Sequence, residues 1–150
     1  MIRYQDSDPF ALLEQLKELL PRHYEELCPS KENLELAPDY DAYRRLFDCG
    51  MLRCITVHHD ERLIGYIIFI VQPHLHYSKS KCAFEDVYWI DPDYRKGRIG
   101  LKMFKFAEKV LKAIGVNRVI LHTKVFQDHS TLFEYMGYTH TDKLFTKFLE

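Results

Sequence analysis

The sequence lacks the features that mark several common classes of protein. Its four cysteines are scattered and include no Cys-x-x-Cys pair: Cys28, Cys49, Cys54 and Cys82. That spacing disfavours both a zinc ribbon and a disulfide framework, and it is typical of reduced thiols. The longest apolar run, residues 63–71, is too short to span a bilayer. No apolar signal-peptide segment follows Met1, so we expect a cytoplasmic protein with no membrane partner.

The charge balance excludes another group of functions. Lysine and arginine together number 21 against 22 for aspartate and glutamate, so the formal net charge is -1. A chain without an overall basic field has little attraction for nucleic acid or for an anionic membrane. Four lysines recur at helical spacing and indicate a solvated helix face: Lys102, Lys105, Lys109 and Lys112. We therefore predict no nucleic-acid partner.

The chain does contain enough apolar sequence for a core. Of its 150 residues, 47% are hydrophobic, and tyrosine and phenylalanine each occur 10 times. No internal repeat, low-complexity tract or long linker divides it. The sequence therefore predicts a single domain over residues 1–150.

The periodicity of the apolar residues predicts the elements of this domain. Helices are expected over residues 9–20, where Pro21 interrupts the first one, and over 39–48, 100–114 and 129–136. Strands are expected over residues 52–58, 62–72, 82–90, 118–125 and 143–149, with room for a short strand at the N-terminus. The first two of these strands form an antiparallel hairpin around residues 59–61. This order predicts an α/β domain built on a mixed sheet.

The turn at residues 94–100 carries the clearest chemical signal. It follows a predicted strand, opens a predicted helix, and holds Arg95, Lys96 and Arg98 within four positions. Backbone N–H groups at a helix start have no intrahelical partner and attract an anion, and Gly100 allows a ligand to approach closely. These features predict a clamp for a phosphate or pyrophosphate. The alternative is an ordinary solvated turn with scattered charge.

Two familiar phosphate-binding motifs are missing. The sequence contains no Gly-x-x-x-x-Gly-Lys-Ser/Thr, which excludes a Walker-type loop. It contains no Gly-x-Gly-x-x-Gly either, and the strand before the turn is not the first of the chain, so a dinucleotide oxidoreductase fits poorly.

This turn and a second segment resemble motifs of the GCN5-related N-acetyltransferase (GNAT) superfamily. Arg95-Lys96-Gly97-Arg98-Ile99-Gly100 is similar to its coenzyme A motif, Arg/Gln-x-x-Gly-x-Gly/Ala. The segment Leu132-Phe133-Glu134-Tyr135-Met136-Gly137-Tyr138 is similar to its aromatic-Glu-x-x-Gly-aromatic signature near the C-terminus. The order of predicted elements also matches that superfamily almost end to end.

The resemblance implies a fold and a reaction. The fold would be the acyl-CoA N-acyltransferase fold, α/β of the α+β type, with flanking helices on a mixed, mostly antiparallel sheet that is splayed between its fourth and fifth strands. Acetyl-CoA would be the co-substrate, and no metal would be needed. A primary amine would attack the thioester directly in a ternary complex. Dimers are common in the superfamily, so a homodimer is compatible with the resemblance.

The resemblance also implies which residues hold coenzyme A. The turn residues would wrap the pyrophosphate with their backbone amides, and two residues of the preceding strand would lie against the pantetheine arm. The expected cofactor-binding residues are Trp89, Ile90, Arg95, Lys96, Gly97, Arg98, Ile99 and Gly100.

The sequence departs from the superfamily pattern at three positions. Arg98 replaces the first glycine of the coenzyme A motif, although Gly97 lies one position earlier, and a guanidinium there could bind the pyrophosphate. Phe133 stands where many members carry a tyrosine that protonates the departing thiolate, and Tyr135, two residues along the helix, points about 200° away. Phe126 stands in place of the usual asparagine. Because Phe133 cannot donate a proton, the departing thiolate would need another acid or, since a thiol has a pKa of about 8.5, none.

The candidates for the general base are Glu85 and Asp86. Superfamily members commonly carry a carboxylate on the fourth strand that takes the amine proton, directly or through water. Strand alternation lets only one of these two side chains face the cleft unless a bulge intervenes. We prefer Glu85 slightly. The alternative for each carboxylate is a purely structural pairing.

Histidines supply the candidate acceptor-binding residues. The loop before the fourth strand often lines the acceptor cleft in the superfamily, which implies roles for His74, His76 and Tyr77. His122, alternating with Lys124 on the next predicted strand, could share one face of the cleft. The histidine spacing matches no known metal site, so we predict no metal.

Two functions remain open at this point. The first is N-acetylation of a small-molecule or peptide amine, whose identity no motif specifies. The second is a catalytically weak or inactive module that binds coenzyme A or a protein partner, which Phe133 favours.

Overall fold

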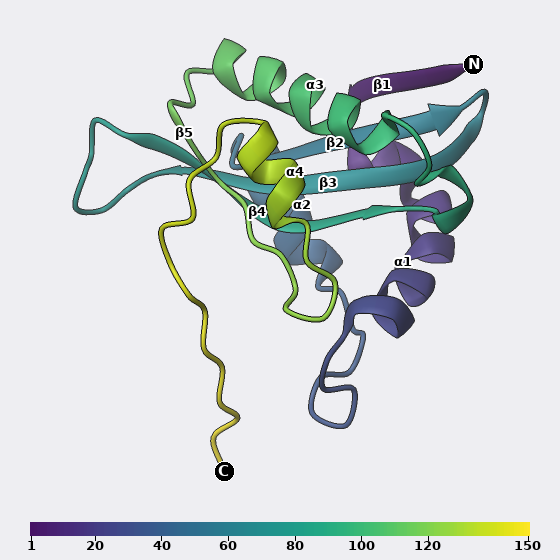
Figure 1. Cartoon of the computed structure of the whole chain (residues 1–150), viewed down its shortest axis with the longest axis horizontal. Coiled ribbons are helices and arrows are strands. Elements are labelled where there is room, and N and C mark those ends of the chain that lie inside the picture. Colours follow the sequence, from purple (N-terminus) through teal and green to yellow (C-terminus); the bar gives the residue numbers. More distant parts are fainter.

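The computed structural model describes residues 1–150 as five strands and four α-helices, with two short 3-10 turns (Figure 1). The strands are β1 (Ile2–Ser7), β2 (Leu52–His59), β3 (Arg62–Pro73), β4 (Lys81–Ile90) and β5 (Arg118–Ile120). The helices are α1 (Leu13–Leu27), α2 (Tyr40–Asp48), α3 (Ile99–Ala113) and α4 (Ser130–Tyr135), and the 3-10 turns are η1 (Pro9–Leu12) and η2 (Pro92–Tyr94). The expected N-terminal strand, β2–β3 hairpin and α3 are therefore present.

The strands form one sheet in the order β1-β2-β3-β4-β5. The pairs β1–β2, β2–β3 and β3–β4 are antiparallel, whereas β5 runs parallel to β4. A parallel neighbour requires a crossover connection, which α3 provides. The expected mixed, mostly antiparallel sheet is confirmed.

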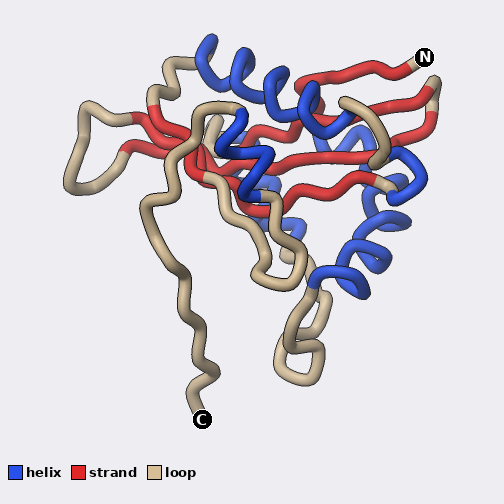
Figure 2. The backbone as a smooth tube through the Cα atoms, in the orientation of Figure 1, coloured by secondary structure: helices blue, strands red, loops and turns tan.

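Helices cover both faces of this sheet. Figure 2 shows the helices in blue on either side of the red strands. On one face, Met103, Phe104 and Leu111 of α3 and Phe133 of α4 pack on the sheet in a 13-residue cluster. On the other face, Leu16 and Leu19 of α1 pack on the sheet in a second cluster of 8 residues, with α2 alongside. Because both faces are buried, β3 is apolar along nearly its whole length, which accounts for the run at residues 63–71.

A β-bulge in β4 decides which way its second half faces. Ile68 is opposite Val87 while the next residue, Phe69, is opposite Glu85, so Asp86 is the extra residue. The inserted residue shifts the alternation, which turns Tyr88 toward the α3 and α4 face and Trp89 toward α1. Without the bulge, these two aromatic side chains would have exchanged faces.

Three expectations about the elements are wrong. Pro21 does not interrupt α1, which continues to Leu27. The pyrrolidine is exposed, so the Lys17 carbonyl that loses its helical donor can reach solvent, and buried leucines on the helix hold it in place. The strand expected over 118–125 ends at Ile120 because the chain turns away from β4 there.

The third error is the strand expected over residues 143–149. Residues 139–150 contain no secondary structure and extend away from the sheet (Figure 1). Leu144, Phe145 and Leu149 are 81%, 86% and 86% exposed. The alternating sequence suits a strand, but a strand needs a neighbour to receive its hydrogen bonds, and this segment has none within the chain.

Candidate active site

The two neighbouring strands β4 and β5 part soon after they meet. Only Cys82, Ala83 and Phe84 of β4 pair with β5, whose last residue is Ile120, whereas β4 continues to Ile90. The second half of β4 therefore has no strand on that side. This is the splay expected from the sequence, and it leaves space for a ligand between the two chain segments.

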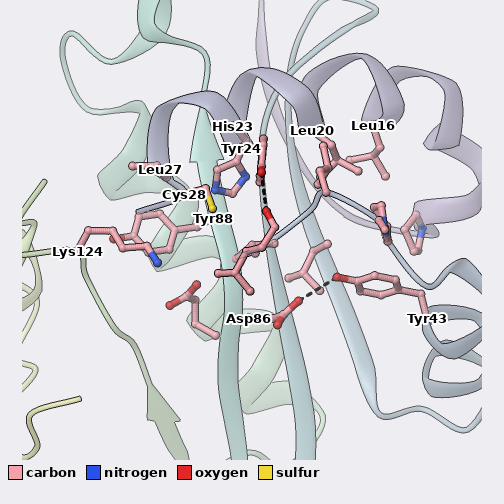
Figure 3. Close-up of a pocket in the computed structure, with 18 of the residues that line it drawn as sticks. Leu16, Leu20, His23, Tyr24, Leu27, Cys28, Tyr43, Asp86, Tyr88 and Lys124 are labelled. Carbon is pink, nitrogen blue, oxygen red and sulfur yellow. Dashed lines mark hydrogen bonds between the residues drawn. The ribbon is translucent and has the colours of Figure 1, made fainter. Parts of the chain in front are cut away.

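A pocket of about 430 Å³ lies at this splay (Figure 3). It is bounded by α1, the segment 28–38, α2, the bulged part of β4 and the segment 122–129. Of its 27 lining residues, 15 are hydrophobic. A concave, mostly apolar site with a few polar groups is the usual form of a small-molecule site.

The turn after β4 presents a row of free backbone donors. None of the N–H groups of residues 96–101 donates a hydrogen bond within the protein. Gly97 adopts φ +89°, a conformation that favours glycine, and a Cβ on Gly100 would meet only the Cδ1 of Ile90, at 3.5 Å. Neither Lys96 nor Arg98 forms an ion pair. Free donors, two uncommitted cations and open space above a glycine together fit the pyrophosphate of coenzyme A.

Arg95, by contrast, is engaged within the protein. Its Nε donates to the Ile90 carbonyl at 2.8 Å, and its Nη2 donates to Glu26 Oε2 at 2.6 Å. Glu26 also accepts from Trp89 Nε1 at 2.8 Å and from Gln127 Nε2 at 3.1 Å. The hydrogen bonds from Arg95 are the main reason that the pKa of Glu26 falls to about 2. Arg95 thus ties the turn to α1.

Two of the expected cofactor residues differ in placement. Trp89 is buried in the α1-side cluster, where its Nε1 donates to Glu26, and its backbone lies in the part of β4 that has no β5 neighbour. Ile90 lies on the opposite face, against Gly100.

A buried aspartate holds the end of β4. Asp91 Oδ2 accepts from Arg22 Nη1 at 3.0 Å and from Arg62 Nη2 at 3.1 Å. Burial alone would raise the pKa of Asp91, but these two guanidinium groups and the Asp93 N–H lower it overall. The ion pairs connect α1, β3 and η2 directly in front of the turn, and they fix the position from which the free amides project.

The bulge brings both candidate carboxylates to the pocket, in different surroundings. The Glu85 side chain is 1% exposed, and its Oε2 lies 2.8 Å from His122 Nδ1 and 3.2 Å from the His122 backbone nitrogen. Asp86 is exposed and accepts from Tyr43 Oη at 3.0 Å (Figure 3). Only one of the two carboxylates is therefore joined to an imidazole.

His122 has the properties of a base held by a carboxylate. Its side chain is 45% exposed and lines the pocket, and its Nε2 has no partner in the protein. The hydrogen bond to Glu85 raises the pKa of His122, against the effect of burial. A raised pKa with a free Nε2 gives an imidazole that can accept a proton near neutral pH.

Tyr88 stands beside the phenylalanine that replaces the superfamily tyrosine. Its ring packs edge-on against Phe133 with the centroids 6.1 Å apart. Its hydroxyl lies 2.8 Å from His129 Nδ1, and both residues line the pocket. Burial raises the pKa of Tyr88 to about 12 and lowers that of His129. A protonated phenol paired with a neutral imidazole therefore faces the splay.

The expected acceptor loop does not reach this pocket. His74, His76 and Tyr77 belong to the loop between β3 and β4, where the His74 ring packs in a tilted arrangement against Tyr77 and His76, with ring centroids 4.9 Å and 5.9 Å away. The β3–β4 ladder continues to the pair Pro73 and Lys81, and Glu85 lies four positions further along β4. Four positions along a strand span about 13 Å, so the length of the β3–β4 hairpin places this loop away from the pocket.

The sequence did not single out the individual residues that α1, α2 and the segment after β5 contribute to the site. Glu26, Gln127, His23 and Tyr43 all line or support the pocket. The helical apolar stripe of α1 indicated only a core face, and no local pattern separates its buried leucines from those that face a ligand. His122 was expected near the cleft, but its pairing with Glu85 joins residues 37 positions apart.

A mixed sheet that parts beside a helix-opening turn is the architecture of an acyl-CoA N-acyltransferase. The chain belongs to the acetyltransferase (GNAT) family, whose family model matches residues 13–138. The resemblance seen in the sequence is therefore confirmed. No curated protein matches the sequence.

Solved structures share the fold over their whole length. A transcriptional regulator from Bacillus halodurans C-125 matches with a TM-score of 0.79 and 17% identity, covering 99% of this chain and 100% of that one. Glucosamine-6-phosphate N-acetyltransferase from Arabidopsis thaliana matches at 0.74 and 12%, covering 100% and 99%. A predicted acetyltransferase with acetyl-CoA from Clostridium acetobutylicum matches at 0.71 and 12%, covering 98% and 96%. At these identities the likeness establishes the fold.

None of the helices has the length and apolar character needed to cross a membrane. No group of three or more histidine, cysteine, aspartate or glutamate side chains lies close enough together to hold a metal ion.

Proposed function

We propose that this protein is an N-acetyltransferase that transfers the acetyl group of acetyl-CoA to a primary amine in a ternary complex. The observation that carries the proposal is the pair formed by the buried Glu85 and the half-exposed His122, which lies at the parting of β4 and β5 in the same pocket as Tyr88. Membership of the acetyltransferase (GNAT) family supports it, as do relatives named as an N-acetyltransferase and as an acetyltransferase with acetyl-CoA.

The turn after β4 would bind the coenzyme. The free N–H groups of residues 96–101 would donate to the pyrophosphate, and Lys96 and Arg98 would add positive charge beside it. Gly100 leaves room for close approach, and Arg95 positions the turn through Glu26. The backbone of Trp89 and Ile90, on the open edge of β4, would lie along the pantetheine arm.

His122 would remove the proton from the amine. An alkylammonium has a pKa near ~10 and must lose a proton before its nitrogen can attack. His122 Nε2 faces the pocket without a partner and would accept this proton, and Glu85 would stabilise the imidazolium through Nδ1. Glu85 thus acts through His122. Asp86, which already accepts from Tyr43, is the alternative base.

Tyr88 would supply the acid that Phe133 cannot. Bound acetyl-CoA supplies an acetyl group activated as a thioester, so that the new C–N bond forms as the C–S bond breaks with its electron pair on sulfur. Tyr88 Oη would donate a proton to that sulfur. With Nδ1 protonated, His129 would donate to Tyr88 Oη, and it would return that proton to the phenolate as its Nε2 takes up a proton from solvent.

The test is thiol release from acetyl-CoA against a panel of primary amines, together with calorimetric binding of acetyl-CoA. We expect binding, and amine-dependent release of one thiol per acetylated amine. Binding without release with any amine would overturn the proposal. It would favour the second candidate, a module that binds coenzyme A or a protein partner, which is suggested by the burial of Phe133 in the core where an acid is usual.

We also infer the setting in which the enzyme works. Four free cysteines suit a reducing cytoplasm, and we assign residues 1–150 to one catalytic domain.

For the homodimer, we propose that residues 139–150 of each copy lie along the open edge of β5 in the other. That edge adjoins a groove of about 460 Å³ lined partly by Val119, Met136 and Tyr138, while the apolar side chains of the segment find no cover in their own chain.

A further inference from the structure

The wall of the pocket is apolar over most of the length of α1. Leu13, Leu16, Leu20 and Leu27 line it at helical spacing, and Ile68 of β3 faces them from the sheet. Leu16 and Leu27 are 11 residues apart, which is about 16 Å along a helix. The apolar wall is thus longer than the acetyl group and the attacking nitrogen require.

The candidate acid Tyr88 lies toward one end of this apolar wall. In Figure 3, Tyr88 and Lys124 lie below the Leu27 end of α1, whereas Tyr43 lies toward the Leu16 and Leu20 end. An amine that meets His122 therefore has the apolar part of the pocket available for the remainder of its structure.

Two exposed leucines continue this apolar surface to the mouth of the pocket. Leu34 is 46% exposed and Leu36 is 37% exposed, and both line the pocket. They lie in a segment without helix or strand, held to α1 by the Tyr24 hydroxyl, which donates to the Leu34 carbonyl at 2.5 Å. Large apolar side chains open to solvent at the rim of a concave site indicate an apolar ligand.

The charges of the pocket do not suit a polycation. Its lining carboxylates are Glu35, Glu85 and Asp86, of which Glu85 is paired with His122 and Asp86 is bonded to Tyr43. Lys124 and three histidines, including His122, lie in the same lining. A ligand with several ammonium groups would have to bury most of them without a partner, which is costly.

The geometry points to an acceptor whose single primary amine is attached to an apolar aromatic or aliphatic body. This inference rests on the proposed function, because it names the substrate class of the same site. The amine lies at the Glu85–His122 pair, and the body lies between α1, Ile68 and the rim leucines. A free arylalkylamine and a peptide that begins with a large apolar residue share this chemistry.

The experiment compares four acceptors by thiol release from acetyl-CoA: phenylethylamine, a Phe-Ala amide dipeptide, spermidine and kanamycin. We expect kcat/KM for one of the first two to exceed that for spermidine and kanamycin at least tenfold. The comparison within the first pair separates the two sources. Equal or better turnover of the polycations would overturn the inference.

A matched pair of variants ties the preference to the rim. Leu36→Asn should reduce kcat/KM for the preferred apolar amine at least threefold while leaving acetyl-CoA binding unchanged. Leu75→Asn makes the same change at a leucine that is 98% exposed and outside the pocket, and it should have no effect. Equal kinetics in the two variants would count against the assignment of the rim.

Binding measurements keep the inference separate from the proposed function. If no amine releases thiol, calorimetry of phenylethylamine and spermidine on the full chain still compares the two ligands. Tighter binding of phenylethylamine would support the acceptor class while the proposed catalysis fails. Tighter binding of spermidine would overturn the class whatever the turnover.

Discussion

The Oε2 atom of Glu85 lies 2.8 Å from Nδ1 of His122, and the carboxylate is almost completely buried while the imidazole reaches the pocket. Glu85 lies opposite Phe69, directly before the extra residue of the β4 bulge, and Nε2 of His122 has no partner within the protein. This relationship distinguishes Glu85 from its neighbour Asp86 as the candidate that supports a base.

Removal of the Glu85 charge should slow the reaction and shift its pH dependence. General base catalysis contributes about 10²- to 10⁴-fold to a reaction rate. We therefore expect Glu85→Gln to decrease kcat/KM by a factor in that range. Glu85 raises the pKa of His122, so the acidic limb of kcat/KM should move to lower pH in the variant. Acetyl-CoA binding should not change. Asp86→Asn is the control, and a large loss there with none in Glu85→Gln would reverse the assignment.

Replacement of Tyr88 tests the acid. Tyr88→Phe keeps the ring packing against Phe133 and removes only the hydroxyl, so kcat should fall by about tenfold or more. Because burial places the pKa of Tyr88 at about 12, the wild-type rate should show no alkaline loss from this group up to about pH 10. Tyr135→Phe, at a tyrosine that is 74% exposed, should behave as wild type. Full activity of Tyr88→Phe would mean that solvent protonates the thiolate.

Charge reversal in the turn tests the coenzyme site. Arg98→Glu should raise the dissociation constant for acetyl-CoA at least tenfold by calorimetry, because an added carboxylate repels the pyrophosphate. The effect should weaken as salt concentration rises. Lys109→Glu makes a similar change on the exposed face of the same helix and should leave the dissociation constant near that of wild type. An unchanged affinity in Arg98→Glu would refute the clamp.

Acid unfolding should report on Glu26. Its pKa is depressed from 4.5 to about 2 in the folded protein, mainly by the hydrogen bonds from Arg95. A carboxyl whose pKa is depressed on folding stabilises the fold at pH values above its unfolded pKa, and this stabilisation is lost as pH falls from about 5 to about 2. Glu26→Gln should therefore be less stable at neutral pH and show a flatter free energy of unfolding across that window. Glu25→Gln, on the exposed side of α1, should retain the wild-type slope.

The C-terminal segment should control the oligomeric state. Sedimentation velocity should show a dimer for the full chain and a monomer when Phe145→Ser and Leu149→Ser are combined, because these side chains are 86% exposed in the single chain. Leu75→Ser, another exposed leucine, should remain dimeric. A monomeric wild-type protein, or a dimer that survives the double change, would exclude this mode of association.

The parts of the fold that the sequence predicted are those with strong local signals. The β2–β3 hairpin follows from two β-rich runs around a short turn, and α3 follows from its apolar stripe and the glycine after it. The strand expected over residues 143–149 failed because alternation describes a side-chain pattern and not the presence of a neighbour. Pro21 failed as a helix stop because packing of the flanking leucines outweighs a local penalty of about 3 kcal/mol.

The candidate site likewise has one part that the sequence predicted and one part that it did not. The turn at residues 95–100 is contiguous, so its charges, glycines and position before a helix can be recognised in one dimension. The pairs Glu85–His122, Tyr88–His129 and Arg95–Glu26 join residues 37, 41 and 69 positions apart. No local pattern encodes such distances.

The sequence by itself determined the family, the approximate order of elements and the turn that we propose binds a phosphate, because these depend on short-range periodicity and helix-end chemistry. Only the tertiary structure decided which carboxylate meets an imidazole, which aromatic hydroxyl stands beside Phe133, and that Arg95 supports the turn from within the protein. The physical reason is that each of these relationships joins residues distant in the sequence, and for Tyr88 it is also the single inserted residue at Asp86. A bulge changes the facing of every residue after it, and its position is set by pairing with β3 rather than by the residues of β4 alone.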